Sequence, residues 1–126
     1  MTDVNKVTLI GRLTKDIDVG YTQNGAAIGK FSIAVNRTRS GANGNIDEVS
    51  YFNCKIFGKL AEAMKQYLLK GKQIAIVGFL KQERWQDQEG RQQSMVSIGV
   101  EELELLGSKK ESSSENNGYD AYGYGE

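Results

Sequence analysis

Apolar side chains recur at every second position in two stretches of the first half of the chain, residues 4–13 and 29–37. The positions that share one parity are Val7, Leu9 and Leu13 in the first stretch and Phe31, Ile33 and Val35 in the second. A period of two is typical of half-buried β-strands. The Asn24-Gly25 pair ahead of the second stretch predicts a turn.

A third strand is predicted over residues 48–57, and both of its faces carry large side chains. One parity holds Phe52, Cys54 and Ile56, and the other holds Val49, Tyr51, Asn53, Lys55 and Phe57. In a sheet with one solvated face the second parity should be polar. Tyr51 and Phe57, on either side of Lys55, therefore need a second layer of protein or a ligand.

The pattern changes to a helical period in residues 59–70, with Gly71 placed as the left-handed residue that ends a helix. The apolar positions at helical spacing are Leu60, Ala63, Met64, Tyr67 and Leu68. One amphipathic helix of about three turns is expected.

Extended patterns return in residues 73–86 and 95–106, with a turn signal at 87–90 between them. In the first of these, Ile74, Ile76 and Leu80 share the core parity, and Phe79, Lys81 and Trp85 share the other. Val96, Ile98 and Val100 share a face in the second. The predicted order is three strands, one helix and two strands.

This order favours an all-β fold with one helix, a five-stranded Greek-key barrel of the oligonucleotide/oligosaccharide-binding (OB) type. Gly11, Gly78 and Gly99 would let the long strands bend. An open α+β sandwich is the alternative, and periodicity does not choose between the two.

Composition divides the 126 residues into a domain, 1–107, and a tail, 108–126. The tail has serines, glycines, tyrosines and acidic residues but no Val, Ile, Leu, Met or Phe. It cannot bury enough apolar surface to offset the entropy of ordering, so we expect it to be disordered. Residues 1–108 hold 14 basic and 12 acidic side chains, a bias too small to indicate a partner.

The absence of histidine from the sequence excludes the common nucleophile pairs and the commonest metal ligand. We therefore expect no catalysis, no cofactor and no metal. Glu101 lies on the side of the last strand opposite Glu102 and Glu104, and that pair could bind Mg²⁺. Charges that protect a strand edge are the favoured interpretation of all three. With no apolar run of 18 residues and no signal sequence, we expect a soluble cytoplasmic protein with no membrane partner.

Six ordered blocks resemble the bacterial single-stranded DNA-binding protein family over about residues 3–107. They are Val4-Asn5-Lys6-Val7, Gly11-Arg12-Leu13, Asn24-Gly25, Phe57-Gly58-Lys59-Leu60-Ala61-Glu62, Tyr67-Leu68-Leu69-Lys70-Gly71 and Trp85-Gln86-Asp87-Gln88-Glu89-Gly90. The resemblance implies the OB fold, a homotetramer, location at the nucleoid, and sequence-independent coating of single-stranded DNA in replication, repair and recombination.

The resemblance also implies the site residues. Bases would stack on Tyr51, Phe57 and Trp85, and Arg39 would stand where the family commonly has another aromatic residue. The basic set for the phosphate backbone is Lys6, Arg12, Arg37, Arg39, Lys55, Lys59, Lys70, Lys72, Lys81 and Arg84. Packing at a subunit interface is the competing role for each aromatic, and a solvated surface position is the competing role for each basic residue.

The carboxyl end departs from the family, whose members typically finish in an acidic tip closed by Pro-Phe. This chain ends Gly123-Tyr124-Gly125-Glu126 and has no proline. Recruitment of replication and repair proteins through such a tip is in doubt, and a divergent tail or a shortened chain would explain the difference. Two other function classes are alternatives, namely a different OB module that binds RNA or assembles primosomes, and a small barrel enzyme.

Overall fold

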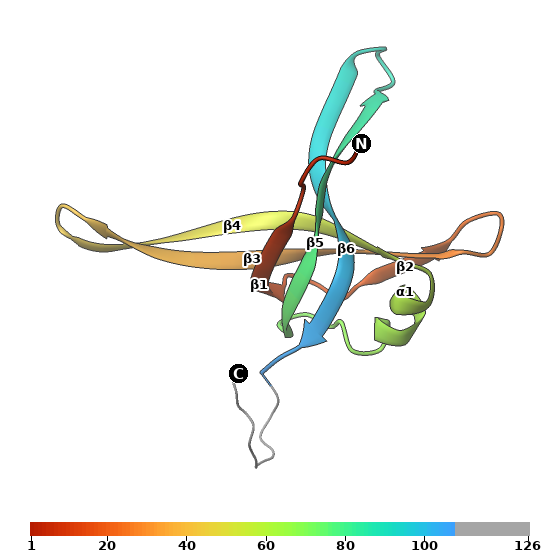
Figure 1. Ribbon diagram of the computed structural model, residues 1–126. Helices are drawn as coiled ribbons and strands as arrows, with labels where there is room; N and C mark the ends of the chain where they lie inside the picture. Colours follow the sequence, from red (N-terminus) through yellow and green to blue (C-terminus); the bar gives the residue numbers. More distant parts are fainter. Residues whose placement is uncertain (108–126) are drawn as a thin grey trace.

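The computed structural model describes residues 1–107, and the predicted tail, 108–126, lies outside the described residues. The described part contains six strands and one helix (Figure 1). Their bounds are β1 Val7–Leu13, β2 Asp18–Tyr21, β3 Ala27–Gly41, β4 Gly44–Phe57, α1 Gly58–Met64, β5 Gln73–Gln86 and β6 Gln92–Leu105.

Five of the strands close into a barrel. β1 pairs antiparallel with both β3 and β5, β3 pairs with β4, and β5 pairs with β6. A short parallel contact between β4 and β6, at Cys54–Ile98 and Lys55–Gly99, closes the ring. β2 adds to the free edge of β3. This is the Greek-key OB barrel that the order of elements predicted, and the open sandwich is excluded.

The core is built from the alternating positions of the strands. Its largest fully buried side chains are Ile33, Ile56, Leu68, Ile74, Ile76, Ile98 and Cys54. Helix α1 contributes Ala61, which is also completely buried. Because each strand gives every second residue to this core, the remaining parity of β3 and β4 faces outward.

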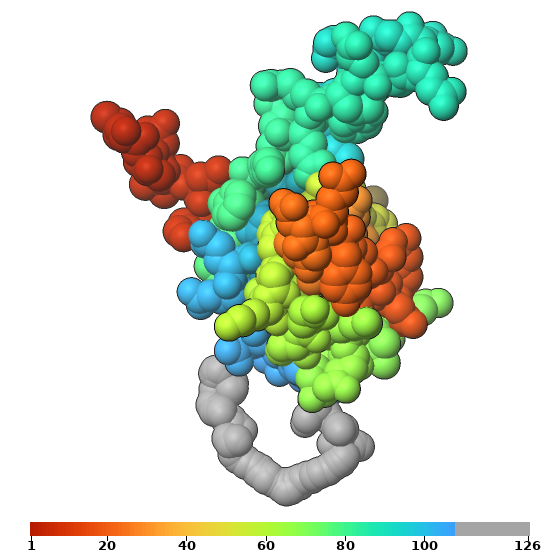
Figure 2. Space-filling model, turned by 90° about the vertical axis from the view of Figure 1, so that its right-hand side faces the viewer, coloured from red at the N-terminus to blue at the C-terminus, as the bar shows by residue number. Residues whose placement is uncertain are grey.

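The β3–β4 and β5–β6 hairpins extend beyond the barrel (Figure 1). The β3–β4 arm, residues 36–49, continues the register from Asn36–Val49 to Gly41–Gly44. The β5–β6 arm, residues 81–97, leaves the barrel beyond the last contact with β4. In the space-filling view the β5–β6 arm stands out from the top of the body (Figure 2).

The structure differs from the sequence expectations at three places. The strand β2 was not predicted, and the helix ends at Met64 rather than at residue 70, because a turn buries Leu68. Leu80, assigned to the core parity, is 47% exposed because it lies where the hairpin leaves the barrel.

Gly78 of β5 lies close against the backbone of Gly99 in β6. A Cβ atom there would lie 2.1 Å from the carbonyl oxygen of Gly99. The register between β5 and β6 shifts at the same place, since Val77 pairs with Glu102 and Gly78 pairs with Val100. The shift is a β-bulge, which increases the local twist where the barrel gives way to the arm.

Candidate nucleic-acid interface

The outward face of β4 carries two exposed aromatic residues. Tyr51 is 65% exposed and Phe57 is 49% exposed, and Asn53 and Lys55 lie between them on the same parity. The register sets Lys55 directly opposite Lys30 of β3. Both aromatics therefore lie off the core face, as their parity predicted.

Trp85 belongs to the β5–β6 arm and is 45% exposed. It lies two residues after Glu83, so the two side chains share one face of the arm. Glu83 reaches across to β4, where its Oε2 is 2.7 Å from Lys55 Nζ. This face of the arm is therefore turned toward the outward face of β4.

A groove of about 340 Å³ lies where the two faces meet. Its lining comes from five strands, β2 to β6, and from the segment between β1 and β2. The residues are Lys15, Asp18, Lys30, Phe31, Ser32, Asn53, Cys54, Lys55, Glu83, Met95 and Ser97. Tyr51, Phe57 and Trp85 are not among these lining residues, but they lie on β4 and β5, two of the strands that contribute to the lining.

The ion pair between Lys55 and Glu83 is the most enclosed one in the described part of the chain, with the two side chains 28% and 25% exposed. The hydroxyl of the buried Ser97 also donates to Glu83 Oε2, at 2.7 Å. These hydrogen bonds, from Lys55 first and then Ser97, lower the pKa of Glu83. Glu83 is therefore ionised throughout the neutral range, and Lys55 already has an anionic partner.

Several other predicted basic residues also have partners within the chain. Lys6 Nζ is 2.8 Å from Glu101 Oε1, which raises the pKa of Lys6. Arg12 donates to the carbonyl oxygen of Gly71, and Arg84 donates to Gln82. These contacts lie on exposed surface, where such pairs add little stability and exchange readily.

Arg39 lies apart from the aromatic residues of β4. It pairs with Ile46 in the register, which places it on the parity opposite to Ala34, the cross-strand neighbour of Tyr51. Its Nε donates to Glu48 Oε2 at 2.8 Å, and Arg37 approaches the same carboxylate at 3.6 Å. Arg37 and Arg39 therefore lie on the other face of the β3–β4 hairpin from Tyr51.

The remaining basic candidates are spread over three elements. Lys59 lies in α1, and Lys70 and Lys72 lie in the segment before β5. Lys81 opens the β5–β6 arm on the same parity as Glu83, and its charge contributes to the lowered pKa of Glu83. Of these four, only Lys81 is thereby placed beside the groove.

Comparison with known protein families identifies the chain. The Single-strand binding protein family matches residues 4–106. The chain belongs to this family. Within it, a single-stranded DNA-binding protein of Treponema pallidum is 45% identical over 108 residues, covering 86% of this chain and 61% of the relative. Another, of Borreliella burgdorferi, is 45% identical over 109 residues, covering 86% and 73%. The chain thus spans less than two thirds of the first relative.

Solved structures agree with the fold of this single-strand binding family member. The Plasmodium falciparum SSB complex with ssDNA superimposes with a TM-score of 0.79 at 20% identity, covering 85% of this chain and 98% of that one. A deletion mutant of the single-stranded DNA binding protein from Thermus aquaticus gives a TM-score of 0.75 at 28% identity, covering 84% and 52%.

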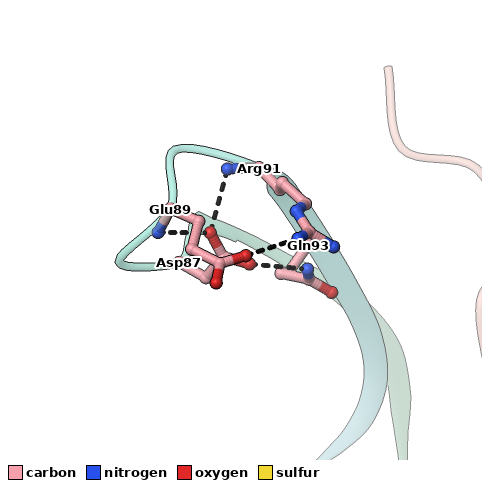
Figure 3. A network of polar contacts seen from close by, with 4 residues as sticks. All are labelled: Asp87, Glu89, Arg91 and Gln93. Carbon is pink, nitrogen blue, oxygen red and sulfur yellow. Dashed lines mark hydrogen bonds and ion pairs between the residues drawn. The ribbon is translucent and has the colours of Figure 1, made fainter.

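The tip of the β5–β6 arm is a well-ordered turn built on Asp87 (Figure 3). Asp87 Oδ1 accepts from the backbone N–H groups of Glu89 and Arg91, and Oδ2 accepts from the side chain of Gln93. These bonds, that from Arg91 first, lower the pKa of Asp87. The turn, predicted from the sequence, fixes the strand pairing that carries Trp85 opposite Gln93.

The groove is also lined by Lys15 and Lys30, which were not among the predicted site residues. Alternation did place Lys30 on the outward parity of β3, but the register that sets it opposite Lys55 depends on the tertiary fold. Lys15 lies between two strands, in a segment with no regular pattern. Nothing in the local sequence distinguishes these two from solvated lysines.

Residues 1–107 contain no cluster of three or more His, Cys, Asp or Glu side chains suited to a metal ion. In the same part of the chain no helix is long and apolar enough to cross a membrane.

Proposed function

We propose that this chain binds and protects single-stranded DNA without sequence preference in replication, recombination and repair, at the nucleoid and without catalytic turnover. The observation that carries this proposal is the placement of Tyr51, Phe57 and Trp85. They are 65%, 49% and 45% exposed, and they lie on β4 and β5, two of the strands that contribute to the lining of the groove. Exposed aromatic residues arranged in this way suit a ligand with flat faces.

The physical basis of such binding is stacking together with charge. Every base has a π-face, so stacking on an aromatic ring contributes roughly 1–3 kcal/mol per base whatever the sequence. Exposed lysines and arginines attract the phosphates and release condensed counterions. Lys59, Lys70 and Lys81 are exposed and can contribute in this way, whereas Lys6, Arg12, Arg37, Arg39 and Arg84 would first exchange their partners within the chain.

A homotetramer is the assembly implied by the family resemblance, and exposed apolar side chains support self-association. Ile10 of β1 is 53% exposed, and Leu80 and Val96 of the β5–β6 hairpin are 47% and 56% exposed. Leu80 and Val96 lie on the parity opposite to Trp85, so subunits that meet there would leave the groove open. Apolar side chains of this size on a surface commonly mark an interface.

The proposal is tested by titrating fluorescently labelled oligo(dT) with the protein at several salt concentrations, with the mass of the complex measured by sedimentation. We expect the logarithm of the affinity to fall linearly with the logarithm of salt, at about 0.7 per phosphate neutralised. The free protein should sediment as a tetramer.

Duplex DNA and RNA of equal length serve as controls. Duplex should bind far more weakly, because its bases are stacked on one another and cannot reach the aromatic side chains. Equal affinity for duplex, or affinity that does not change with salt, would contradict the mechanism. A clear preference for RNA would favour the alternative, a different OB module.

A further inference from the structure

The groove contains more positive charge than its internal partners neutralise. Its lining includes three lysines, Lys15, Lys30 and Lys55, and two carboxylates, Asp18 and Glu83. Glu83 is 2.7 Å from Lys55 and forms the enclosed ion pair described above. That pair is electrically neutral, so its net attraction for a phosphate is small.

Lys15 and Lys30 differ from Lys55 in this respect. Both are exposed, and within residues 1–107 neither forms an ion pair or hydrogen bond with another side chain. Asp18 is the register neighbour of Lys30 on β2, yet the two do not come within ion-pairing distance in the described structure. These lysines are therefore available to an anion that enters the groove.

The position of Lys30 is a second reason to expect an anion in the groove. It lies directly opposite Lys55 across the β3–β4 pair, and like charges placed directly opposite one another destabilise a sheet. Glu83 relieves this repulsion on the side of Lys55. An anion bound beside Lys30 would relieve it on the other side, and a second hollow of about 220 Å³, lined in part by Lys30 and Asp18, adjoins there.

We propose that Lys15 and Lys30 form a phosphate-binding subsite on the floor of the groove, and that Lys55 and Glu83 form its neutral wall. The ligand class is the phosphodiester backbone of a single strand, so this inference rests on the proposed function. The sequence analysis assigned Lys55 to the phosphate backbone. The proposal assigns this contact to Lys15 and Lys30 instead, which are not in the predicted set. The Lys55–Glu83 pair instead joins β4 to the β5–β6 arm that carries Trp85.

The test compares the salt dependence of oligo(dT) binding for matched variants, because the slope counts the phosphates that are neutralised. Lys15→Gln and Lys30→Gln should each lower the slope by about 0.7. The factor by which affinity falls between 50 and 200 mM salt should then be about 2.6-fold smaller for each variant than for the unmodified chain. Lys65→Gln removes an exposed lysine that does not line the groove, and should leave the slope unchanged.

A double variant, Lys55→Gln with Glu83→Gln, removes the ion pair without changing the net charge. We expect its slope to equal that of the unmodified chain. Unchanged slopes for Lys15→Gln and Lys30→Gln, or a lowered slope for the double variant, would overturn the subsite while leaving the proposed function standing. Failure of the unmodified chain to bind oligo(dT) would remove both.

Discussion

Burial governs the chemistry of the one cysteine, Cys54. Its side chain is 1% exposed, and burial raises the pKa of its thiol to about 12. A thiolate is the reactive form, so the native protein should be inert toward alkylation. Iodoacetamide at pH 8 should label the unfolded chain much faster than the native one. Equal rates would show that the barrel opens at β4.

The same thiol predicts a dependence of stability on pH. In the unfolded chain the thiol ionises near pH 8.5, whereas in the folded chain it stays protonated until about pH 12. Its contribution to stability is therefore complete below about pH 8.5 and is lost as the pH rises from there toward the folded pKa. Urea denaturation of the chain and of Cys54→Ala from pH 7 to 10 should show a steeper decline for the chain itself. Parallel curves would contradict the assignment.

At the scale of the elements, the backbone of β5 at Gly78 lies so close to β6 that a side chain there would clash. A Cβ at Gly78 would lie 2.1 Å from a backbone oxygen, and no side-chain rotation can relieve that contact. Gly78→Ala should therefore lower the free energy of unfolding by about 1–3 kcal/mol. Gly20→Ala is the matched control, since nothing lies within 4 Å of its Cβ position, and it should stay within about 0.5 kcal/mol of the unmodified chain. Similar losses for both variants would refute this account.

The elements that the sequence predicted best are those in which apolar residues alternate over the longest stretch. β5 and the buried parts of β3 and β4 follow from alternation, because each residue of one parity enters the core. The outer half of the β3–β4 arm could not be found in this way, since residues 36–49 are mostly polar on both parities and face no core. It is held by cross-strand pairs such as Thr38 with Asp47 and Arg39 with Glu48, which are specified by register rather than by a local pattern.

The shortened helix has a related cause. Tyr67 and Leu68 continue the helical spacing, but only Leu68 is buried, and a turn after Met64 is enough to bury it. The four-residue strand β2 is too short for its alternation to be visible. For the site, parity identified Tyr51 and Phe57, whereas the convergence of Lys15, Lys30 and Glu83 depends on which strands the barrel brings together.

At the scale of the whole molecule, the barrel is complete before the predicted tail begins. Near the end of the described residues, the backbone N–H of Leu106 donates a hydrogen bond to the carbonyl oxygen of Gln73. All described strands lie within residues 7–105. Removal of residues 108–126 should therefore leave the melting temperature nearly unchanged. It should also strengthen binding of single strands slightly at low salt, because it removes a net charge of −2 that competes with phosphate. A fall of several degrees would show that the tail contributes to the fold.

The central claim, that bases stack on the exposed aromatic side chains of β4 and β5, is tested most directly by the fluorescence of Trp85. It is the only tryptophan, so its emission reports one site. Saturating oligo(dT) should strongly quench this emission. Trp85→Ala should weaken binding by about 1–3 kcal/mol per site, and Trp85→Phe should weaken it less because a stacking face remains. Unquenched emission at saturation, with an alanine variant that dissociates the assembly instead of losing affinity, would contradict the account and place Trp85 at a subunit interface.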